Sequence, residues 1–371
     1  MKAKVLQLFW FGVFALMAGR YPEPTQAQQY TITKVDTLGG ASGVALAVND
    51  LGQVTGSADT PEGQRHAYLW AAGEIIDLGS FPPFAQSEAW GINNVGQVVG
   101  IATNSGDYSH GFLWENGKMI DLGDLVDPGE LDTDAIGVND SGQVVGVSQI
   151  AFKEWYAFVW EKGTMTGIPS QLGGTGSRAL DVNTAGHFVG GAATRTESHA
   201  FLMMDGVMSD LGTLGGEFSR AYGVNDFDQV VGRSERPEGG NIYHAFLWEK
   251  GKMIDLGKIG GFASSWACAI NNGGQVIGVP PFLYHPDTGM QNLADLLPPD
   301  TEWIGLFPRD INNVGQIVGS GGFQGSPGKA FLMTPIDADF NDDGDVDLAD
   351  FACFQICFTG PELPPGEECP S

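Results

Sequence analysis

Short runs of apolar residues, separated by turn-forming residues, make up most of this sequence. In one stretch, an extended run over residues 89–93 is followed by an Asn/Gly-rich turn and by apolar runs over 97–101, 110–114 and 118–122. An Asn-Gly pair, which is typical of tight hairpin turns, separates the last two runs. Runs of this length bounded by turns predict β-strands. We therefore predict four consecutive strands here, and no helical period appears before residue 345.

The same order of segments recurs seven times, at intervals of about 44 residues. Each copy opens on a turn of the type Asn-x-x-Gly-Gln, and a block resembling His-Ala-Phe-Leu-Trp follows. The copies begin at Asn49, Asn93, Asn139, Asn183, Asn225, Asn271 and Asn312. Four strands per unit in seven units are typical of an all-β, seven-bladed β-propeller of four-stranded blades.

The two ends of the repeat region complement each other. The last copy lacks a fourth strand, because the chain reaches Pro335 directly after the third one, whereas a matching strand precedes the first copy at 30–40. We predict that this N-terminal strand closes the propeller, since it would cover an otherwise unpaired sheet edge. The propeller is accordingly predicted over residues 28–334.

The first strand of each repeat is predicted to be the innermost one. The residue two before the repeat Asn is small in five copies, as a crowded central axis requires, and is Asp181 or Asp310 in the others. The residue five before the Asn lies near a mouth of the channel and differs between copies: Val44, Glu88, Asp134, Arg178, Arg220, Trp266 and Phe307. We predict Glu88, Asp134, Arg178, Arg220 and Trp266 as candidate ligand-binding residues for a glycan or a peptide. The alternative is that these are ordinary solvated loop residues.

Residues 199–232, reading HAFLMMDGVMSDLGTLGGEFSRAYGVNDFDQVVG, carry the fullest form of the repeat. This segment resembles the extracellular HAF repeat, named for its His-Ala-Phe core, and the resemblance covers residues 30–334. It implies a secreted or surface-located repeat protein without an established activity. The fourth repeat departs from the pattern at His187 and Phe188, and the sixth at Pro280 and Pro281, so irregular blades are expected there.

The charge of the chain narrows its possible partners. Lys and Arg number 18 against 45 Asp and Glu, for a net charge of −27. A nucleic-acid partner is therefore not expected, because two polyanions repel.

The first 27 residues have the pattern of a signal peptide. Lys2 and Lys4 precede an apolar run over residues 5–19, and small residues stand at 25 and 27 of the Thr-Gln-Ala sequence. The run is shorter than the roughly 20 residues needed to span a bilayer, and no later segment reaches that length. We expect export to the cell surface or beyond, without a transmembrane anchor.

Residues 339–350 have the spacing of an EF-hand calcium loop. Oxygen-bearing side chains stand at every ligand position, with Gly344 at the sharp turn. The predicted ligands of one Ca²⁺ ion are Asp339, Asn341, Asp343, Asp345 and Asp350. The alternative is an acidic linker with chance spacing.

The tail at 335–371 resembles a dockerin, with Asp at the last loop position and a helix predicted over 348–358. A dockerin has two such loops and this chain has one, which leaves cohesin binding in doubt. Cys353, Cys357 and Cys369 allow a disulfide, and we favour Cys357 with Cys369 because they would join the end of the chain to the helix. Cys268, in the sixth repeat, is expected to be a buried thiol.

Two other recurrent side chains have a structural interpretation. His66, His110, His199 and His244 share one register. Equivalent atoms of neighbouring blades lie too far apart at this register to share a zinc ion, so a hydrogen bond repeated in each blade is favoured. The Asp of the recurrent Asp-Leu-Gly is expected to be a turn acceptor.

Two classes of function fit this sequence. The favoured one is a non-enzymatic, exported binding scaffold whose partner is a protein or glycan at the cell surface. The alternative is a carbohydrate-active propeller enzyme, a glycoside hydrolase or polysaccharide lyase, that uses two of the carboxylates Glu88, Asp134, Asp181 and Asp310. Sequence motifs of serine hydrolases, zinc proteases and phosphate-binding loops are absent.

Overall fold

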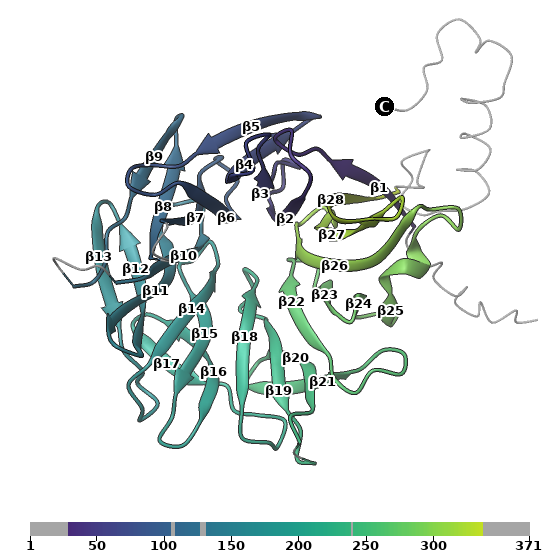
Figure 1. Cartoon of the computed structure of the whole chain (residues 1–371). Coiled ribbons are helices and arrows are strands. Elements are labelled where there is room, and N and C mark those ends of the chain that lie inside the picture. Colours follow the sequence, from purple (N-terminus) through teal and green to yellow (C-terminus); the bar gives the residue numbers. More distant parts are fainter. Residues whose placement is uncertain (1–28, 105–107, 127–130, 239, 337–371) are drawn as a thin grey trace, which may run out of the picture.

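The computed structural model describes residues 29–104, 108–126, 131–238 and 240–336. In these residues the chain forms seven four-stranded antiparallel sheets, arranged as blades around a central axis (Figure 1). The seven-bladed β-propeller predicted from the repeats is confirmed. The predicted signal peptide, calcium loop, tail helix and the cysteines at 353, 357 and 369 lie outside the described residues.

Six blades are built from four strands that follow one another along the chain. The first two are β2 (Gly43–Val48), β3 (Val54–Asp59), β4 (Arg65–Ala71) and β5 (Glu74–Gly79), then β6 (Gln86–Ile92), β7 (Val98–Thr103), β8 (Ser109–Glu115) and β9 (Lys118–Asp121). The next two are β10 (Thr133–Val138), β11 (Val144–Ala151), β12 (Glu154–Glu161) and β13 (Thr164–Ile168), then β14 (Ser177–Val182), β15 (Phe188–Ala193), β16 (Ser198–Met204) and β17 (Val207–Asp210). The fifth and sixth are β18 (Ser219–Val224), β19 (Val230–Glu235), β20 (Tyr243–Glu249) and β21 (Lys252–Gly257), then β22 (Trp266–Ile270), β23 (Val276–Val279), β24 (Phe282–His285) and β25 (Gly289–Asn292). A 3-10 helix, η1 (Leu293–Leu296), leads into the last blade.

The seventh blade joins the two ends of the propeller. It contains β26 (Trp303–Ile311), β27 (Ile317–Phe323) and β28 (Ser326–Pro335), and β1 (Tyr30–Val35) is its outer strand. Strands β1 and β28 are antiparallel, with Tyr30 opposite Pro335 and Val35 opposite Ala330 (Figure 1). The predicted closure by the N-terminal strand is therefore confirmed.

Each blade buries one large aromatic side chain from its third strand. These rings have no exposed surface, and they are Tyr68, Phe112, Phe158, Phe201, Phe246, Phe282 and Phe331. Opposite each ring on the second strand stands a glycine, such as Gly100 opposite Phe112. A Cβ at Gly100 would lie 2.0 Å from the carbonyl oxygen of Glu88, so no other residue fits there. The last Gly of the repeat motif thus sets how closely the second strand approaches the first.

The recurrent histidines link the third and fourth strands of their blades, as predicted. In the second blade Nδ1 of His110 lies 3.0 Å from Oδ2 of Asp121, whose Oδ1 accepts the backbone N–H of Gly123. The same bonds recur for His66, His199 and His244 with Asp77, Asp210 and Asp255. The Asp of Asp-Leu-Gly is thus both a turn acceptor and the partner of the histidine.

The irregularities expected in the fourth and sixth repeats have local explanations. His187 replaces the repeat Gln in the fourth blade, and Asp228, with φ of +57°, replaces the turn Gly in the fifth. Nδ1 of His187 lies 2.7 Å from Oδ1 of Asp228, so the two departures form one contact between blades. In the sixth blade Pro280 and Pro281 shorten the hairpin, and β23 and β24 have four residues each.

The described residues contain no helix that is long and apolar enough to cross a membrane.

The closure of the propeller predicts a large difference between two positions on β1. Tyr30 is fully buried in a cluster with Ile317, Phe331 and Met333, whereas Thr33 on the same strand is exposed. We expect Tyr30→Ala to lower the free energy of unfolding by about 3 kcal/mol or more, and Thr33→Ala by less than about 0.5 kcal/mol. Urea unfolding of both variants measures this, and equal effects would contradict closure by β1.

Candidate functional site

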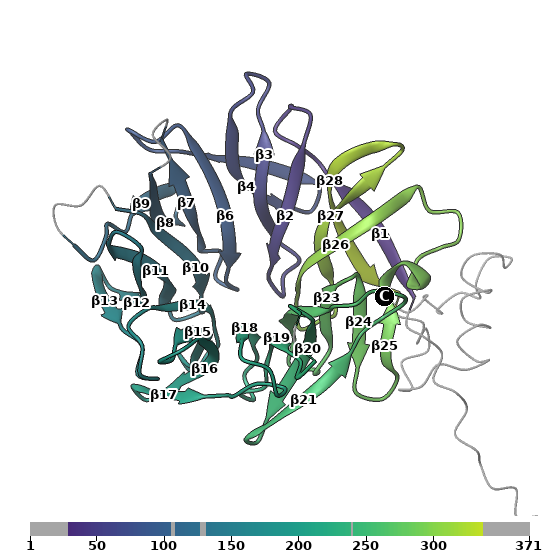
Figure 2. The ribbon, with the colours of Figure 1, turned by 60° about the horizontal axis from the view of Figure 1, so that its bottom comes forward.

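The central channel has two mouths of different character. The inner strands β2, β6, β10, β14, β18, β22 and β26 begin at one mouth and end in the Asn turns at the other (Figure 2). We name the mouth at the Asn turns the asparagine mouth. The mouth at which the inner strands begin is the variable mouth, defined by the residues five before each repeat Asn: Val44, Glu88, Asp134, Arg178, Arg220, Trp266 and Phe307.

A closed ring of hydrogen bonds encircles the asparagine mouth. The side-chain Nδ2 of each repeat Asn donates to the backbone carbonyl of the Asn in the next blade, over distances of 2.8 to 3.1 Å. The ring closes where Asn312 donates to the carbonyl of Asn49, 263 residues away in sequence. Each Asn is buried, and Oδ1 of Asn93, for example, accepts the N–H of Gln97 in its own turn. One side chain therefore shapes its own turn and joins two blades.

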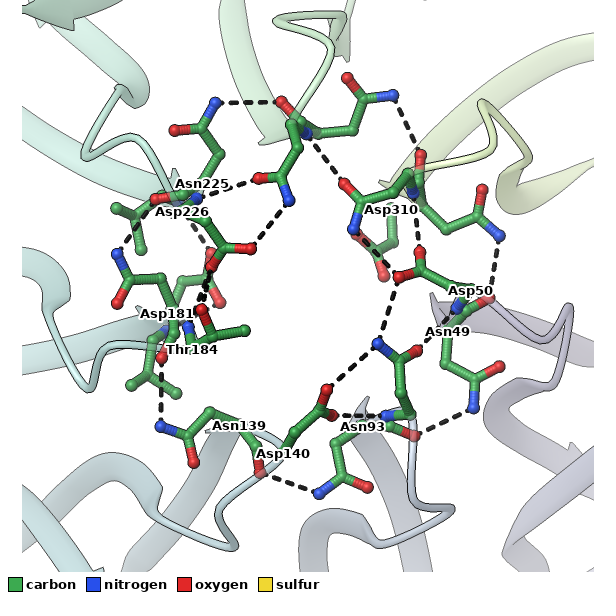
Figure 3. A pocket seen from close by; sticks show the side chains of 18 of the residues that line it. Asn49, Asp50, Asn93, Asn139, Asp140, Asp181, Thr184, Asn225, Asp226 and Asp310 are labelled. Atoms are coloured by element: carbon green, nitrogen blue, oxygen red, sulfur yellow. Dashed lines mark hydrogen bonds between the residues drawn. The ribbon is translucent and has the colours of Figure 1, made fainter.

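A second ring of polar side chains lies beside the first (Figure 3). It is formed by the residues after each repeat Asn: Asp50, Asn94, Asp140, Thr184, Asp226, Asn272 and Asn313. Backbone N–H groups donate to the neighbouring side chain, as from Asn94 to Oδ1 of Asp140 at 2.7 Å. No two carboxylates are adjacent in this order around the ring, since Asn or Thr separates each pair. This arrangement avoids repulsion between like charges.

Asp181 and Asp310 line the same cavity, which has a volume of about 180 Å³. Each carboxylate accepts two backbone N–H groups: Asp181 from Val182 and Val224, and Asp310 from Ile311 and Val48. Burial raises the pKa of Asp181 to about 7 and that of Asp310 to about 6, although the N–H donors act in the opposite direction. The charge of Asp310 further raises the pKa of Asp181. These two carboxylates connect neighbouring inner strands.

The variable mouth holds the five predicted ligand-binding residues on successive inner strands. Glu88 accepts hydrogen bonds from Ser57 and from the indole of Trp90, at 2.8 and 2.7 Å. Asp134 accepts one from Ser109 at 3.0 Å, and burial raises its pKa. All five side chains are half-buried.

The cationic part of this mouth is packed on aromatic rings. The guanidinium carbon of Arg178 lies 4.9 Å from the ring centre of Trp155, and that of Arg220 lies 5.4 Å from that of Phe218. Arg233 lies 5.9 Å from Trp266. Arg233 was not among the predicted ligand-binding residues, because it stands on the second strand of its blade. Only its pairing with Arg220 places it at this mouth.

The four carboxylates considered for catalysis do not form a single group. Glu88 and Asp134 stand near the start of their inner strands. In the repeat register Asp181 and Asp310 stand three residues further along, which corresponds to about 10 Å along an extended strand. Asp181 and Asp310 are also held by backbone donors on both oxygens. In the described parts of the chain, no group of three His, Cys, Asp or Glu side chains could hold a metal ion.

Cys268 differs from the expectation of a core thiol. It is half-buried, and it occupies the position at which every inner strand is irregular in its pairing with the second strand. Leu46, Trp90, Ile136, Leu180 and Tyr222 share that register and are also half-buried. The extra residue is not paired in the ladder, so its side chain escapes full burial in the blade core. Burial nevertheless raises the pKa of the Cys268 thiol to about 12.

The buried carboxylates predict a pH dependence of stability. The pKa values of Asp181 and Asp310 are higher in the folded protein than the ordinary 3.8, so stability falls as pH rises from about 4 to about 7. Between pH 5 and pH 8 the wild type should lose free energy of unfolding. In the Asp181→Asn, Asp310→Asn double variant we expect this loss to be smaller by at least about 1.4 kcal/mol, the free energy that corresponds to a shift of one pKa unit. Urea unfolding at both pH values measures it. The exposed Asp205→Asn is the control, and an equal loss in wild type and double variant would contradict the prediction.

Comparisons with known proteins agree with this architecture. No family model matches the sequence, and no curated protein matches it. The structure is similar to oligogalacturonate lyase from Vibrio parahaemolyticus, with a TM-score of 0.51 and 10% identity over 82% of this chain and 97% of that one. It is also similar to a Mycobacterium tuberculosis puromycin-hydrolyzing peptidase, with a TM-score of 0.51 and 14% identity, over 76% of this chain and 48% of that one. TolB from Acinetobacter baumannii aligns with a TM-score of 0.46, at 10% identity over 83% of this chain and 97% of that one. At these identities the similarity is one of fold.

Proposed function

We propose that this protein is an exported, non-enzymatic scaffold that binds a glycan at its variable mouth. The observation that carries this proposal is the contrast between the two mouths. At the asparagine mouth, side chains that recur from blade to blade bond to one another in rings. At the variable mouth, the side chain changes from blade to blade on the same backbone frame, with six residue types in seven blades. Diversity on a rigid frame is typical of binding sites.

Aromatic and charged side chains together favour a glycan as the ligand. Trp155, Tyr222, Tyr243 and Trp266 are half-buried and surround the arginines, so flat apolar faces lie next to hydrogen-bonding groups. Sites of this composition stabilise ligands that have both apolar faces and polar edges, as sugar rings do. The signal peptide predicted at residues 1–27 would place the protein outside the cell, where such ligands occur.

A binding experiment with matched variants tests this proposal. The wild type, Trp266→Ala and Leu51→Ser are compared on a glycan array, with reducing-sugar release measured on the same glycans. Leu51 lies at the asparagine mouth with 71% of its side chain exposed, so its replacement serves as the control. We expect at least 10-fold weaker binding for Trp266→Ala only, without sugar release. The proposal would be contradicted if Leu51→Ser weakened binding as much as Trp266→Ala does, or if the protein released reducing sugars.

We further propose that the tail binds one Ca²⁺ ion through the loop at 339–350. The spacing of its oxygen-bearing side chains supports this, as does the attraction of so acidic a loop for a cation. The role we assign to the ion is folding the segment that follows, because ion binding offsets the cost of ordering a single loop.

Calorimetry on the full chain tests the calcium site. We expect one Ca²⁺ ion per chain, with a dissociation constant of roughly 0.1 to 1 mM, as in extracellular modules. Asp339→Ala with Asp343→Ala should abolish this heat, whereas Asp295→Ala, in the propeller, should leave it unchanged. Identical heats in the wild type and the loop variant would mean that the loop is a solvated linker.

A further inference from the structure

We propose that three arginines at the variable mouth bind the carboxylates of an acidic oligosaccharide. They are Arg178 on β14, Arg220 on β18 and Arg233 on β19, and we call them the arginine cluster. The inference rests on the proposed function and specifies its ligand class. Its evidence is a group of positive charges that form no ion pair within the described residues.

Two members of the cluster are direct cross-strand partners. Arg220 and Arg233 stand opposite each other on β18 and β19. Like charges in such a pair destabilise a sheet. Burial, and after it the positive charge of Arg220, lower the pKa of Arg178, which fits a guanidinium that lies near that of Arg220. An unliganded protein therefore holds this arrangement at a cost.

Carboxylates are abundant in this chain, yet none pairs with the cluster within the described ranges. Arg65 and Arg236, in contrast, form ion pairs with Asp59 and Glu238 at 3.2 Å. Asp134 attracts Arg178, but its Oδ1 accepts the hydroxyl of Ser109. The cluster is thus positively charged within a protein of net charge −27.

Aromatic rings take the place of carboxylates around these guanidinium groups. Phe218 contacts both Arg220 and Arg233, at 5.4 and 5.5 Å from the ring centre, and Arg233 also lies 4.9 Å from Tyr243. Rings stabilise a cation without neutralising it and leave its planar hydrogen-bonding edge free for a carboxylate. The Nε atoms of Arg220 and Arg233 are buried and have no hydrogen-bond partner. Buried donors without a partner are costly, so the unliganded protein holds these two side chains unfavourably.

A glycine makes room for this arrangement. Gly191 on β15 stands opposite Arg178, and a Cβ there would lie 3.2 Å from Nε of Arg220. The corresponding residue carries a side chain in every other blade: Ser57, Ile101, Val147, Arg233, Val279 and Ser320. The absence of a side chain in the fourth blade lets Arg220 lie against β15, next to Arg178.

The rings around the cluster favour a sugar acid over an acidic peptide. Carboxylates stand close by as well, at Asp132 and Asp134 by the third blade and at Glu88 on the second, so a ligand needs contacts besides charge. A sugar acid has them, because its rings can contact Trp155 and Trp266 while its acids reach the arginines. Bidentate bonds from arginine to carboxylate supply the specificity.

Calorimetry with paired ligands tests the inference. The ligands are a tetrasaccharide of galacturonate, one of mannuronate, and their methyl esters, which lack the charge. We expect the wild type to bind at least one acid, with at least 10-fold weaker binding of its ester and weaker binding at high salt. Arg220→Gln should lose at least 10-fold in affinity for the acid, and Arg195→Gln, which replaces an exposed arginine of the neighbouring fourth blade, should not.

Two further measurements separate binding from a structural role. Arg220→Gln should melt no lower than the wild type without ligand, because it removes a repulsive pair, and Gly191→Val should weaken binding by displacing Arg220. A lower melting temperature for Arg220→Gln would overturn the inference. So would failure of both acids to bind, equal affinity for acid and ester, or equal binding of pentaglutamate. The wild type could instead bind neutral glycans without preferring acids, and Trp266→Ala could lose that binding. This result would support the proposed function and overturn only the inference about acidic ligands.

Discussion

Seven side-chain amides hold the blades together at the axis, and the rest of the propeller depends on them. Each repeat Asn shapes the turn between two strands of its own blade and donates to the backbone of the next blade. Because the ring returns from Asn312 to Asn49, a displacement of one blade would strain the bonds on both of its sides. Hydrogen bonds between buried groups are costly to leave unmade, which explains why the Asn is present in all seven copies.

This constraint leaves the opposite mouth free to vary. The glycine opposite each buried aromatic ring sets the backbone position of the residue five before the Asn, as Gly100 does for Glu88. The frame is therefore fixed by residues that do not point into the mouth. Glutamate, aspartate, arginine or tryptophan can occupy the same position without altering the blade.

The sequence was sufficient to predict the blade number, the closing strand and the pairing role of the histidines, because each recurs at a fixed interval or is missing at one end. It was insufficient for interactions between blades. An Asn in a turn looks the same whether it bonds within its own turn or also reaches the next blade. His187 appeared as a departure of the fourth repeat alone, since its contact with Asp228 joins different repeats. Arg233 was not predicted, because it stands on the second strand and reaches this mouth only through its pairing with Arg220. Cys268 is half-buried because the irregular pairing of its inner strand leaves it out of the ladder.

The closing strand has a consequence for the order of folding. The hydroxyl of Thr31 bonds the carbonyl of Thr334 across 303 positions of the chain, and β1 has no other sheet to join. The first strand to be synthesised must therefore wait for the last one. Blades one to six bring together strands that are close in sequence and can assemble as the chain emerges, whereas the seventh is completed only when residue 335 is available. A chain that stops before residue 335 would carry both an unpaired first strand and an unfinished last blade, so the arrival of β28 is the event that converts an open array into a ring.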